Sequence, residues 1–364
     1  MKLIVNKDVI LEGMQKVQSI VATRSTLPVL YNVYLKAEKD KLWLTATDLE
    51  VTVRTSVEAK IARTGGTTLP ARRLFSIFRE LPANDIEIDV DDKDVASIRS
   101  GASYFKIIGI SEDEFPPLPK FQGNRSYSLA QKLFKNMLLS THYAASRDET
   151  RFILNGVLLS FKGGKLAVVA TDGRRMAMWE QDLDVTREME GEWVIPSKTV
   201  NELLKSLKDE GDLKIQVTES QIAFEFDSML VISKMIEGTY PNFRQVIPSH
   251  TEEHIMLERE LLLNAIRRVA LLVSDKSNSV TLSFGKDTVE VSAVAADVGE
   301  AKEKVAVKYR GKELAISFNP EFLMDPLRNL ASDEVSIDLS DELSPGVIRS
   351  DKPFLYVIMP MRVK

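Results

Sequence analysis

The stretch Lys41-Leu42-Trp43-Leu44-Thr45-Ala46-Thr47-Asp48 recurs twice further along the chain, and this recurrence is the strongest indication of the fold. The second copy is Lys165-Leu166-Ala167-Val168-Val169-Ala170-Thr171-Asp172. A fainter third copy is Val289-Glu290-Val291-Ser292-Ala293-Val294-Ala295-Ala296-Asp297. The closing aspartates lie 124 and 125 residues apart. A period of this length indicates three tandem copies of one domain of roughly 120 residues.

Each copy has the pattern of a β-hairpin. The stretch alternates like a strand, ends at an aspartate, and is followed by a second strand such as Glu50-Val51-Thr52-Val53-Arg54. An aspartate at such a point usually forms the turn by accepting hydrogen bonds from the backbone that follows it. We therefore interpret Asp48, Asp172 and Asp297 as turn residues and not as catalytic carboxylates.

Apolar residues at helical spacing predict two helices in each copy. The second helix of each copy begins at a proline, within Leu69-Pro70-Ala71, Ile195-Pro196-Ser197 and Asn319-Pro320-Glu321, where the missing N–H is not needed. The predicted helices span residues 7–20, 71–81, 130–142, 197–208, 258–273 and 320–330. Each copy thus opens with a helix and reads as helix, strands, helix, strands. This order predicts an α+β fold in which two helices cover one face of an antiparallel sheet.

Proline-containing linkers separate the copies. Phe115-Pro116-Pro117-Leu118-Pro119 closes the first copy, Tyr240-Pro241-Asn242-Phe243 closes the second, and the segment from Pro248 to His254 leads into the third. We place the domains at residues 1–120, 126–246 and 253–364.

The composition is that of a globular protein, with 44% hydrophobic and 28% charged residues. There is no apolar run near 18 residues, so we expect no membrane span. The N-terminus meets an acid at Asp8 and lacks a long apolar core, so we expect no signal peptide. Cysteine is absent, which excludes disulfides and thiolate metal sites and suits a cytoplasmic location.

The charges are unevenly distributed. The six predicted helices carry a net charge of +6, so the remainder of the chain carries −11 if the whole is −5. Chance imbalance among solvated helix faces is one explanation. The alternative is a protein with a basic helical side and an acidic sheet side. The basic side would bind phosphates without reading bases.

Taken together, the chain resembles the bacterial DNA polymerase III β subunit family, the β sliding clamps. The segments that carry the resemblance are Arg24-Ser25-Thr26-Leu27-Pro28-Val29-Leu30, Thr45-Ala46-Thr47-Asp48-Leu49-Glu50, Asn155-Gly156-Val157, Val169-Ala170-Thr171-Asp172-Gly173-Arg174-Arg175 and Val357-Ile358-Met359-Pro360-Met361-Arg362. They occur in the family's order and cover the whole chain.

The resemblance implies a non-catalytic processivity factor without a cofactor. Two chains would pair head to tail, and their six domains would form a ring around duplex DNA. The ring would tether the DNA polymerase III catalytic subunit, the clamp loader, other polymerases and repair proteins through short linear peptides.

The resemblance also implies three sets of site residues. Arg24 and Lys198 match DNA-contacting positions, and Arg72 and Arg73 join them by their place on a helix. Phe105, Leu271 and Leu272 match the apolar part of the dimer contact, with Arg99 opposite Glu300 or Glu303 as an ion pair. The peptide cleft would comprise Leu154, Thr171, Gly173, Arg174, Arg175, Met176, Pro241, Val246, Val357, Met359, Pro360, Met361 and Arg362.

Physical reasons support the cleft. A strand ending in Met359-Pro360-Met361 leaves its ladder at the proline, so both methionines can flank a groove. Thioether chains adapt to several ligands. Arg175 or Arg362 would orient the polar end of the peptide. Two features depart from the family: Arg174 stands where the family usually has histidine, and Val363 and Lys364 extend past Arg362.

Two other functions are compatible with parts of the sequence. His250-Thr251-Glu252-Glu253-His254 matches the H-x-x-E-H pattern of some zinc peptidases, which requires both histidines on one helical turn and a third ligand. A zinc hydrolase using His250, Glu253 and His254 is therefore the alternative. A protein-binding scaffold that does not encircle DNA is a third possibility.

Overall fold

The computed structural model describes residues 1–22, 24–82, 84–118, 121, 125–273, 278–295 and 298–362. It contains two compact units: Met1–Lys135 with Asn201–Met235, and Asn136–Val200 with Ile236–Lys364. Several sequence predictions fall outside the described residues. These are the turn at Asp297, the linker residue Pro119, the domain ends at 120 and 364, and the C-terminal pair Val363 and Lys364.

The first repeat consists of nine strands and two α-helices. In chain order these are β1 (Lys2–Asn6), α1 (Lys7–Gln18), β2 (Asn32–Glu38), β3 (Lys41–Thr47), β4 (Val51–Glu58), β5 (Lys60–Arg63), β6 (Gly65–Pro70), α2 (Ala71–Glu80), β7 (Asp85–Val90), β8 (Val95–Ser100) and β9 (Ser103–Ile108).

The second repeat follows the same order without a counterpart of β5. It comprises β10 (Arg125–Ala130), α3 (Gln131–Leu139), β11 (Gly156–Lys162), β12 (Lys165–Thr171), β13 (Arg175–Asp182), β14 (Gly191–Pro196), α4 (Ser197–Ser206), β15 (Asp212–Val217), β16 (Gln221–Phe226) and β17 (Met229–Lys234).

The third repeat has this order again. It comprises β18 (Glu253–Glu258), α5 (Arg259–Val269), β19 (Val280–Gly285), β20 (Thr288–Ala295), β21 (Gly299–Ala306), β22 (Leu314–Phe318), α6 (Pro320–Asn329), β23 (Glu334–Leu339), β24 (Gly346–Arg349) and β25 (Phe354–Ile358). A short 3-10 helix, η7 (Ala270–Leu272), extends α5.

The three tandem α+β copies and all six predicted helices are therefore confirmed, each helix within a few residues of its predicted bounds. One part of the predicted order was wrong. Each copy opens with a short strand, β1, β10 or β18, that runs directly into the first helix. In the first repeat the Asn6 side chain caps this entry by accepting a hydrogen bond from the N–H of Asp8 at 3.0 Å.

The turn interpretation of the hairpin aspartates is also confirmed where the structure describes them. Asp48 accepts hydrogen bonds from the N–H groups of Glu50 at 3.0 Å and Val51 at 2.8 Å. Asp172 accepts from Arg174 at 2.9 Å and from the residue after it at 3.0 Å. Both carboxylates thus hold the backbone of a β-turn.

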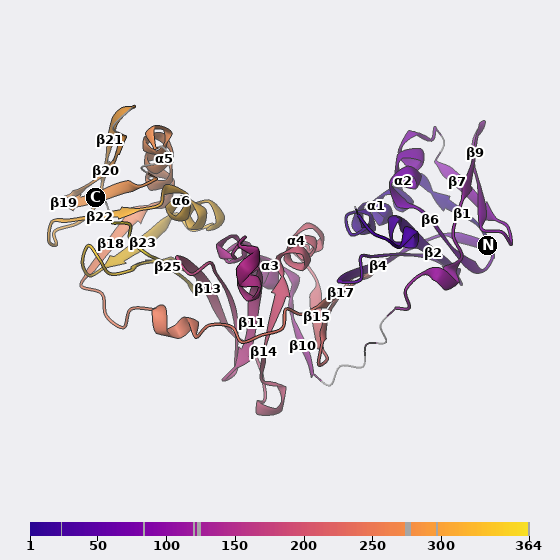
Figure 1. Ribbon diagram of the computed structural model, residues 1–364, viewed down its shortest axis with the longest axis horizontal. Coiled ribbons are helices and arrows are strands. Elements are labelled where there is room, and N and C mark those ends of the chain that lie inside the picture. The colour runs from indigo at the N-terminus through magenta and orange to yellow at the C-terminus, as the bar shows by residue number, and fades with distance from the viewer. Residues whose placement is uncertain are drawn as a thin grey trace. The chain divides into compact units, whose positions relative to one another are not determined.

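The sheets are antiparallel, and each unit has one sheet that continues from one repeat into the next (Figure 1). In the first unit an eight-stranded sheet has the order β10-β15-β16-β17-β4-β3-β2-β6 beside a five-stranded sheet β5-β1-β7-β8-β9. In the second unit an eight-stranded sheet has the order β14-β11-β12-β13-β25-β24-β23-β18 beside a four-stranded sheet β21-β20-β19-β22. Helix α1 packs on α2 and on β3 and β4, while α5 packs on α6 and on β20 and β21.

Consecutive repeats are thus joined by edge-to-edge strand pairing. Strand β4 pairs with β17, and β13 pairs with β25. We call these the first and second junctions. Each junction lies wholly within one compact unit, and the second contains the residues of the predicted cleft.

Candidate functional site

The backbone of the second junction determines where the C-terminal segment lies. Met176 faces Val357 in the β13–β25 ladder. One step further the N–H of Met359 donates to the carbonyl of Arg174 at 3.0 Å. Beyond Pro360 the N–H of Met361 donates instead to the carbonyl of Ser317 at 2.7 Å, so the chain leaves the ladder at the proline as predicted.

The predicted cleft residues divide by exposure into a floor and a rim. Met176, Val357 and Leu154 are buried, at 2%, 1% and 6% exposure, and the first two belong to one apolar cluster. Met359 and Met361 are both 37% exposed. Adaptable side chains at a rim above an apolar floor suit a groove that accepts several partners.

The linker between repeats two and three packs on the same apolar cluster. Phe243 is buried in it, and Tyr240 and Ile247 pack against it. The predicted residues Pro241 and Val246 lie beside these side chains and are exposed. Sequence reasoning named Pro241 and Val246 and missed the three residues that attach the linker. Their signal was the aromatic and aliphatic side chains flanking the linker proline.

Arg175 is already engaged by several groups within the chain. Its guanidinium is mostly buried, pairs with Asp325 and with Asp172 at 3.1 Å, and donates to the carbonyl of Tyr143 at 2.8 Å. It also stacks on Phe322, 4.2 Å from the ring centroid. Burial would lower the pKa of Arg175, but Tyr356 and Asp325 outweigh that effect and raise the pKa above its ordinary value. Arg175 therefore holds the second junction together and has little capacity left for a peptide.

Arg174 and Arg362 are the exposed arginines of the predicted set. Arg174 also lines a pocket of about 680 Å³. The pocket is lined by Ala145, Ser146, Arg147, Asp148, Arg151, Asp172, Arg174, Arg175, Glu321, Phe322, Asp325 and Arg328. Thr171 and Gly173 lie in the same turn, where Gly173 has a φ of +84°.

The four predicted DNA-binding cations are all exposed. Arg72 and Lys198 are each the second residue of the second helix of their repeat, and Arg73 follows Arg72. Arg24 lies after the first helix of repeat one. At the third equivalent position stands Glu321, so this cation is present in two repeats and reversed in the third.

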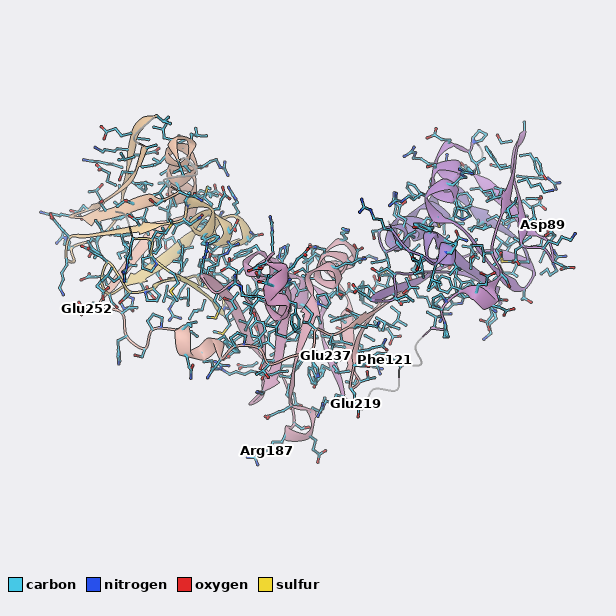
Figure 2. All side chains as sticks on the ribbon, viewed as in Figure 1. Asp89, Phe121, Arg187, Glu219, Glu237 and Glu252 are labelled. Carbon is cyan, nitrogen blue, oxygen red and sulfur yellow. The ribbon has the colours of Figure 1, made fainter. Side chains whose placement is uncertain are left out.

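Acidic side chains occupy exposed turns and linkers. Figure 2 labels three of them: Glu219 between β15 and β16, Glu237 after β17, and Glu252 before β18. All three lie outside the helices.

The predicted dimer residues lie at or next to two sheet edges: Phe105 on β9, Arg99 on the neighbouring β8, Glu300 and Glu303 on β21, and Leu271 and Leu272 on η7. Strand β9 is the last strand of the five-stranded sheet, and β21 is the first of the four-stranded sheet. On β9, Tyr104, Phe105 and Ile108 are 54%, 38% and 76% exposed, and Leu271 beside the other sheet is 79% exposed. Exposed apolar side chains at an unpaired strand edge are unusual in a monomer.

Two proposed ion-pair partners of Arg99 differ in position. Glu303 accepts a hydrogen bond from Arg268 of α5 at 2.8 Å, so it faces the helices. Glu300 lies three residues away along β21 and therefore on the opposite face. Arg99 also lies on the face away from the buried residues Ile98 and Ser100. Glu300 itself pairs with Lys302 at 3.1 Å.

The zinc hydrolase alternative has no support. Glu253 and His254 lie on strand β18 and not on a helix, so their side chains point to opposite faces. Glu253 accepts from the Tyr309 hydroxyl at 3.0 Å, and His254 Nδ1 lies 3.0 Å from Asp338. Among the residues that the structure describes, no three His, Cys, Asp or Glu side chains could hold a metal ion.

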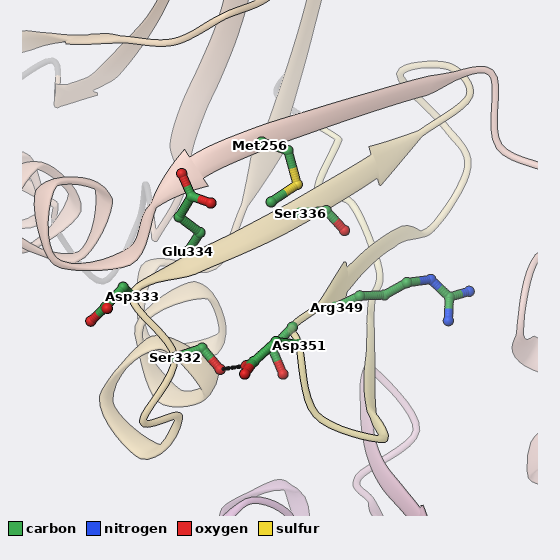
Figure 3. Close-up of a pocket in the computed structure, with 8 residues that line it drawn as sticks. Met256, Ser332, Asp333, Glu334, Ser336, Arg349 and Asp351 are labelled. Carbon is green, nitrogen blue, oxygen red and sulfur yellow. Dashed lines mark hydrogen bonds between the residues drawn. The ribbon is translucent and has the colours of Figure 1, made fainter.

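A pocket of about 410 Å³ lies on the same sheet of repeat three (Figure 3). Its carboxylates do not converge: Asp351 is hydrogen-bonded to Ser332, whereas Asp333 points away from it. Arg349 at its edge donates to Asp338 at 3.0 Å. The described helices include none that is long and apolar enough to span a membrane.

Known proteins match the chain over its whole length. Models of the DNA polymerase III beta subunit match in three parts: the N-terminal domain at residues 1–119, the central domain at 128–242 and the C-terminal domain at 244–362. The beta sliding clamp of Chlamydia pneumoniae is 36% identical, covering 100% of this chain and 99% of the relative. That of Bacillus subtilis is 31% identical, with both chains covered completely.

Solved structures agree with these matches. A crystal structure of a sliding clamp from Pseudomonas aeruginosa bound to griselimycin has a TM-score of 0.96 at 31% identity, with both chains fully covered. A sliding clamp from Bacillus subtilis has a TM-score of 0.95 at 30% identity, again with full coverage.

The three repeats, the continuous junction sheets and these matches define a non-catalytic DNA sliding clamp. The chain belongs to the DNA polymerase III beta subunit family, the bacterial beta sliding clamps.

Proposed function

We propose that two copies of this chain pair head to tail into a closed ring around duplex DNA, with domains at residues 1–120, 126–246 and 253–364. The observation that carries this proposal is a count of strand edges. Each repeat supplies two junction strands. The first of them is β4, β13 and β21 in repeats one, two and three, and the second is β9, β17 and β25 in the same order. Within the chain β4 pairs with β17 and β13 with β25. This leaves β21 of the third repeat and β9 of the first as a matching pair for a second chain.

The repeat also supplies the register of this third junction. The preceding hairpins close at the pairs Glu38–Lys41 and Gly285–Thr288, so Lys41 of β3 is equivalent to Thr288 of β20. Their partners in the next ladder are Glu58 and Ala306, so Thr55 of β4 is equivalent to Glu303 of β21. The hairpin β16–β17 closes at the pair Phe226–Met229, and the hairpin β8–β9 closes at the pair Ser100–Ser103. Met229 of β17 is therefore equivalent to Ser103 of β9.

Met229 faces Thr55 in the first junction. By equivalence, Ser103 of one chain faces Glu303 of the other, which places Phe105 opposite Ala301. The next position pairs Lys106 with Glu300 on the outer face, where Arg99 lies diagonally. Phe105 then points to the helix side, where Leu271 and Leu272 would cover it.

Two cysteines test this closure, because the chain has none of its own. The counterpart of Ala301–Phe105 in the second junction is the pair Ala177–Tyr356. The pairs Arg174–Met359 and Glu180–Pro353 of that ladder are hydrogen-bonded. Because the two kinds of pair alternate along an antiparallel ladder, Ala177–Tyr356 is a non-hydrogen-bonded pair. Such pairs have Cα atoms about 4.5 Å apart, which falls within the range that a disulfide spans.

We expect Phe105→Cys with Ala301→Cys to form a covalently closed dimer on mild oxidation. Phe105→Cys with Lys302→Cys is the matched control, because these side chains point to opposite faces. The locked ring should stay on circular DNA in high salt and slide off after linearisation. A chain that runs as a monomer at micromolar concentration, or an oxidised double variant released equally from both DNA forms, would refute the ring.

DNA would contact the helices through phosphates. Arg24, Arg72, Arg73 and Lys198 are exposed cations suited to this. A ring that slides needs contacts that do not anchor it to one sequence, which phosphate contacts satisfy. We place the ring in the cytoplasm, where it would reach the chromosome.

The second junction would bind the partners. Its buried floor of Leu154, Met176 and Val357 and its exposed rim of Met359 and Met361 support a cleft for short peptides. We propose that the DNA polymerase III catalytic subunit, the clamp loader, other polymerases and repair proteins use this cleft.

A further inference from the structure

The arginine-lined pocket beside the cleft gives Arg174 a role in partner choice. The main chain of Arg174 is fixed, because its carbonyl accepts the N–H of Met359 at 3.0 Å and its own N–H donates to Asp172 at 2.9 Å. Its side chain is exposed and has no hydrogen bond or ion pair to any part of the chain that the structure describes. The main chain of Arg174 is therefore fixed at the rim of the cleft, and the guanidinium remains available to a ligand.

The acids of the pocket are already paired. Asp172 and Asp325 bind Arg175. Asp148 pairs with Arg151 at 3.2 Å, and Glu321 pairs with Arg328 at 3.0 Å. Five arginines thus face four carboxylates in this lining. Arg147 and Arg174 have no such partner within the described residues, so the local excess of positive charge lies at these two side chains.

One turn links the pocket to the apolar floor, although no floor residue lines the pocket itself. Gly173 and Arg174 precede Met176 of the floor, and a Cβ at Gly173 would lie 3.0 Å from Nη1 of Arg151. A peptide whose apolar side chain reaches Met176 would pass Arg174 as it leaves the floor. An extended peptide advances about 3.3 Å per residue, so the arginine would meet a side chain about one to three residues from the anchor.

The balance of charges selects the ligand. A nucleic-acid strand brings a row of phosphates and would face the four carboxylates of the pocket as well as its arginines. A single carboxylate needs only one unpaired guanidinium, which binds it through two parallel N–H groups. We propose that Arg174 makes this clamp prefer partner peptides with an aspartate or glutamate beside the apolar anchor. This inference rests on the peptide cleft proposed above.

The test uses a synthetic C-terminal peptide of the DNA polymerase III catalytic subunit. In a panel, one Asp, Asn or Lys is moved through the three positions on either side of its apolar anchor. Calorimetry measures each dissociation constant with the full-length dimer and with Arg174→Ala, Arg174→Lys and Arg174→Glu variants. Arg187→Ala serves as a matched control, since it removes an exposed arginine from the 3-10 helix Arg187–Met189 between β13 and β14.

At one position we expect the Asp peptide to bind the unmodified clamp about tenfold more tightly than the Asn peptide. The ratio should fall to about one in Arg174→Ala and be intermediate in Arg174→Lys. Arg174→Glu should instead bind the Lys peptide most tightly. Arg187→Ala should leave the ratio unchanged. Equal binding of Asp and Asn peptides to the unmodified clamp, or a ratio that survives Arg174→Ala, would overturn the inference and leave the cleft standing. No binding of any peptide would overturn the cleft as well. Loss of DNA retention in Arg174→Ala with an unchanged peptide ratio would assign the pocket to nucleic acid.

Discussion

The first and second junctions have nearly the same backbone and different surfaces. In the first, the N–H of Lys234 donates to the carbonyl of Glu50 at 2.9 Å. In the second, Met359 donates to Arg174 at 3.0 Å. The two pairs occupy equivalent positions one step beyond the strand ladder. The fold therefore builds the same strand pairing twice, and any difference in binding must come from side chains.

The side chains on the outer face differ in size and charge. In the first junction Trp43 is covered by Arg54, whose guanidinium lies 4.0 Å from the ring centroid. The equivalent residues of the second junction are Ala167 and Met178, both part of the apolar cluster below the cleft. A large ring under a cation fills the first site, whereas the small and flexible pair leaves an apolar floor. A binding site can thus be present at one junction and absent at the other on the same scaffold.

The turns make the same point at a single residue. Leu49 has a φ of +75° and Gly173 a φ of +84°. The left-handed region costs a residue with a side chain roughly 1–2 kcal/mol, yet the first junction tolerates leucine there. Glycine in the second junction therefore leaves room at the rim of the cleft, and backbone geometry alone does not require it.

The largest expected effect comes from removing the third-repeat rim. Deletion of residues 360–364 takes away Pro360, Met361 and Arg362, and with them the hydrogen bond from Met361 to Ser317. We expect peptide affinity to fall more than about a hundredfold, because a few central contacts dominate such interfaces. The dimer and its unfolding temperature should be nearly unchanged, since the buried ladder ends at Ile358. Calorimetry with the polymerase peptide checks this, and an unchanged affinity would place the cleft elsewhere.

The second prediction separates the junction between chains from those within the chain. Leu271→Ala with Leu272→Ala should yield a folded monomer. Leu271 is 79% exposed in the single chain, so its truncation costs little until the dimer forms. Each leucine buried on assembly contributes about 2–5 kcal/mol, enough to shift dissociation by orders of magnitude. Sedimentation from nanomolar to micromolar concentration measures the change. A variant that stays dimeric at nanomolar concentration would contradict the interface.

The third prediction converts one turn into the other. Gly173→Leu should weaken peptide binding about tenfold or more by filling the rim, while the protein stays folded at a cost of roughly 1–2 kcal/mol. The added Cβ meets only the end of the Arg151 side chain, at 3.0 Å. Leu49→Gly is the matched control and should not create a peptide site, because Trp43 and Arg54 still fill the first junction. If the Gly173→Leu variant binds the peptide with normal affinity, the turn is not part of the cleft.

Much of the fold was readable from the sequence because its signals are local. Helix α2 was predicted at 71–81 and spans Ala71–Glu80, since a proline entry and an apolar stripe define it. The opening strands were missed for a non-local reason. Strand β1 has only five residues and no turn before its helix, and its partner β7 lies about 80 residues away.

The sequence predicts those features of the site that depend on a single residue. The departure of the chain at Pro360 follows from one residue, and the structure places it as predicted. The engagement of Arg175 depends on Asp325, 150 residues further along the chain, and no local pattern announces it. The register between chains also required the structure, because it rests on comparing ladder pairs of two junctions.

The smallest expected effect concerns DNA, which would contact the helices and neither junction surface. Arg24→Ala with Lys198→Ala should weaken retention on circular DNA and lower the slope of log affinity against log salt. The slope should fall by up to about one unit for each lost phosphate contact, because each contact releases condensed counterions. Lys93→Ala is the control, since Lys93 is an exposed cation in the turn between strands β7 and β8. Binding measured across a salt series should separate the two variants. If the double variant keeps both the slope and the retention of the unmodified clamp, DNA must be held by other cations, and the assignment of Arg24 and Lys198 to DNA contact fails while both junctions remain as described.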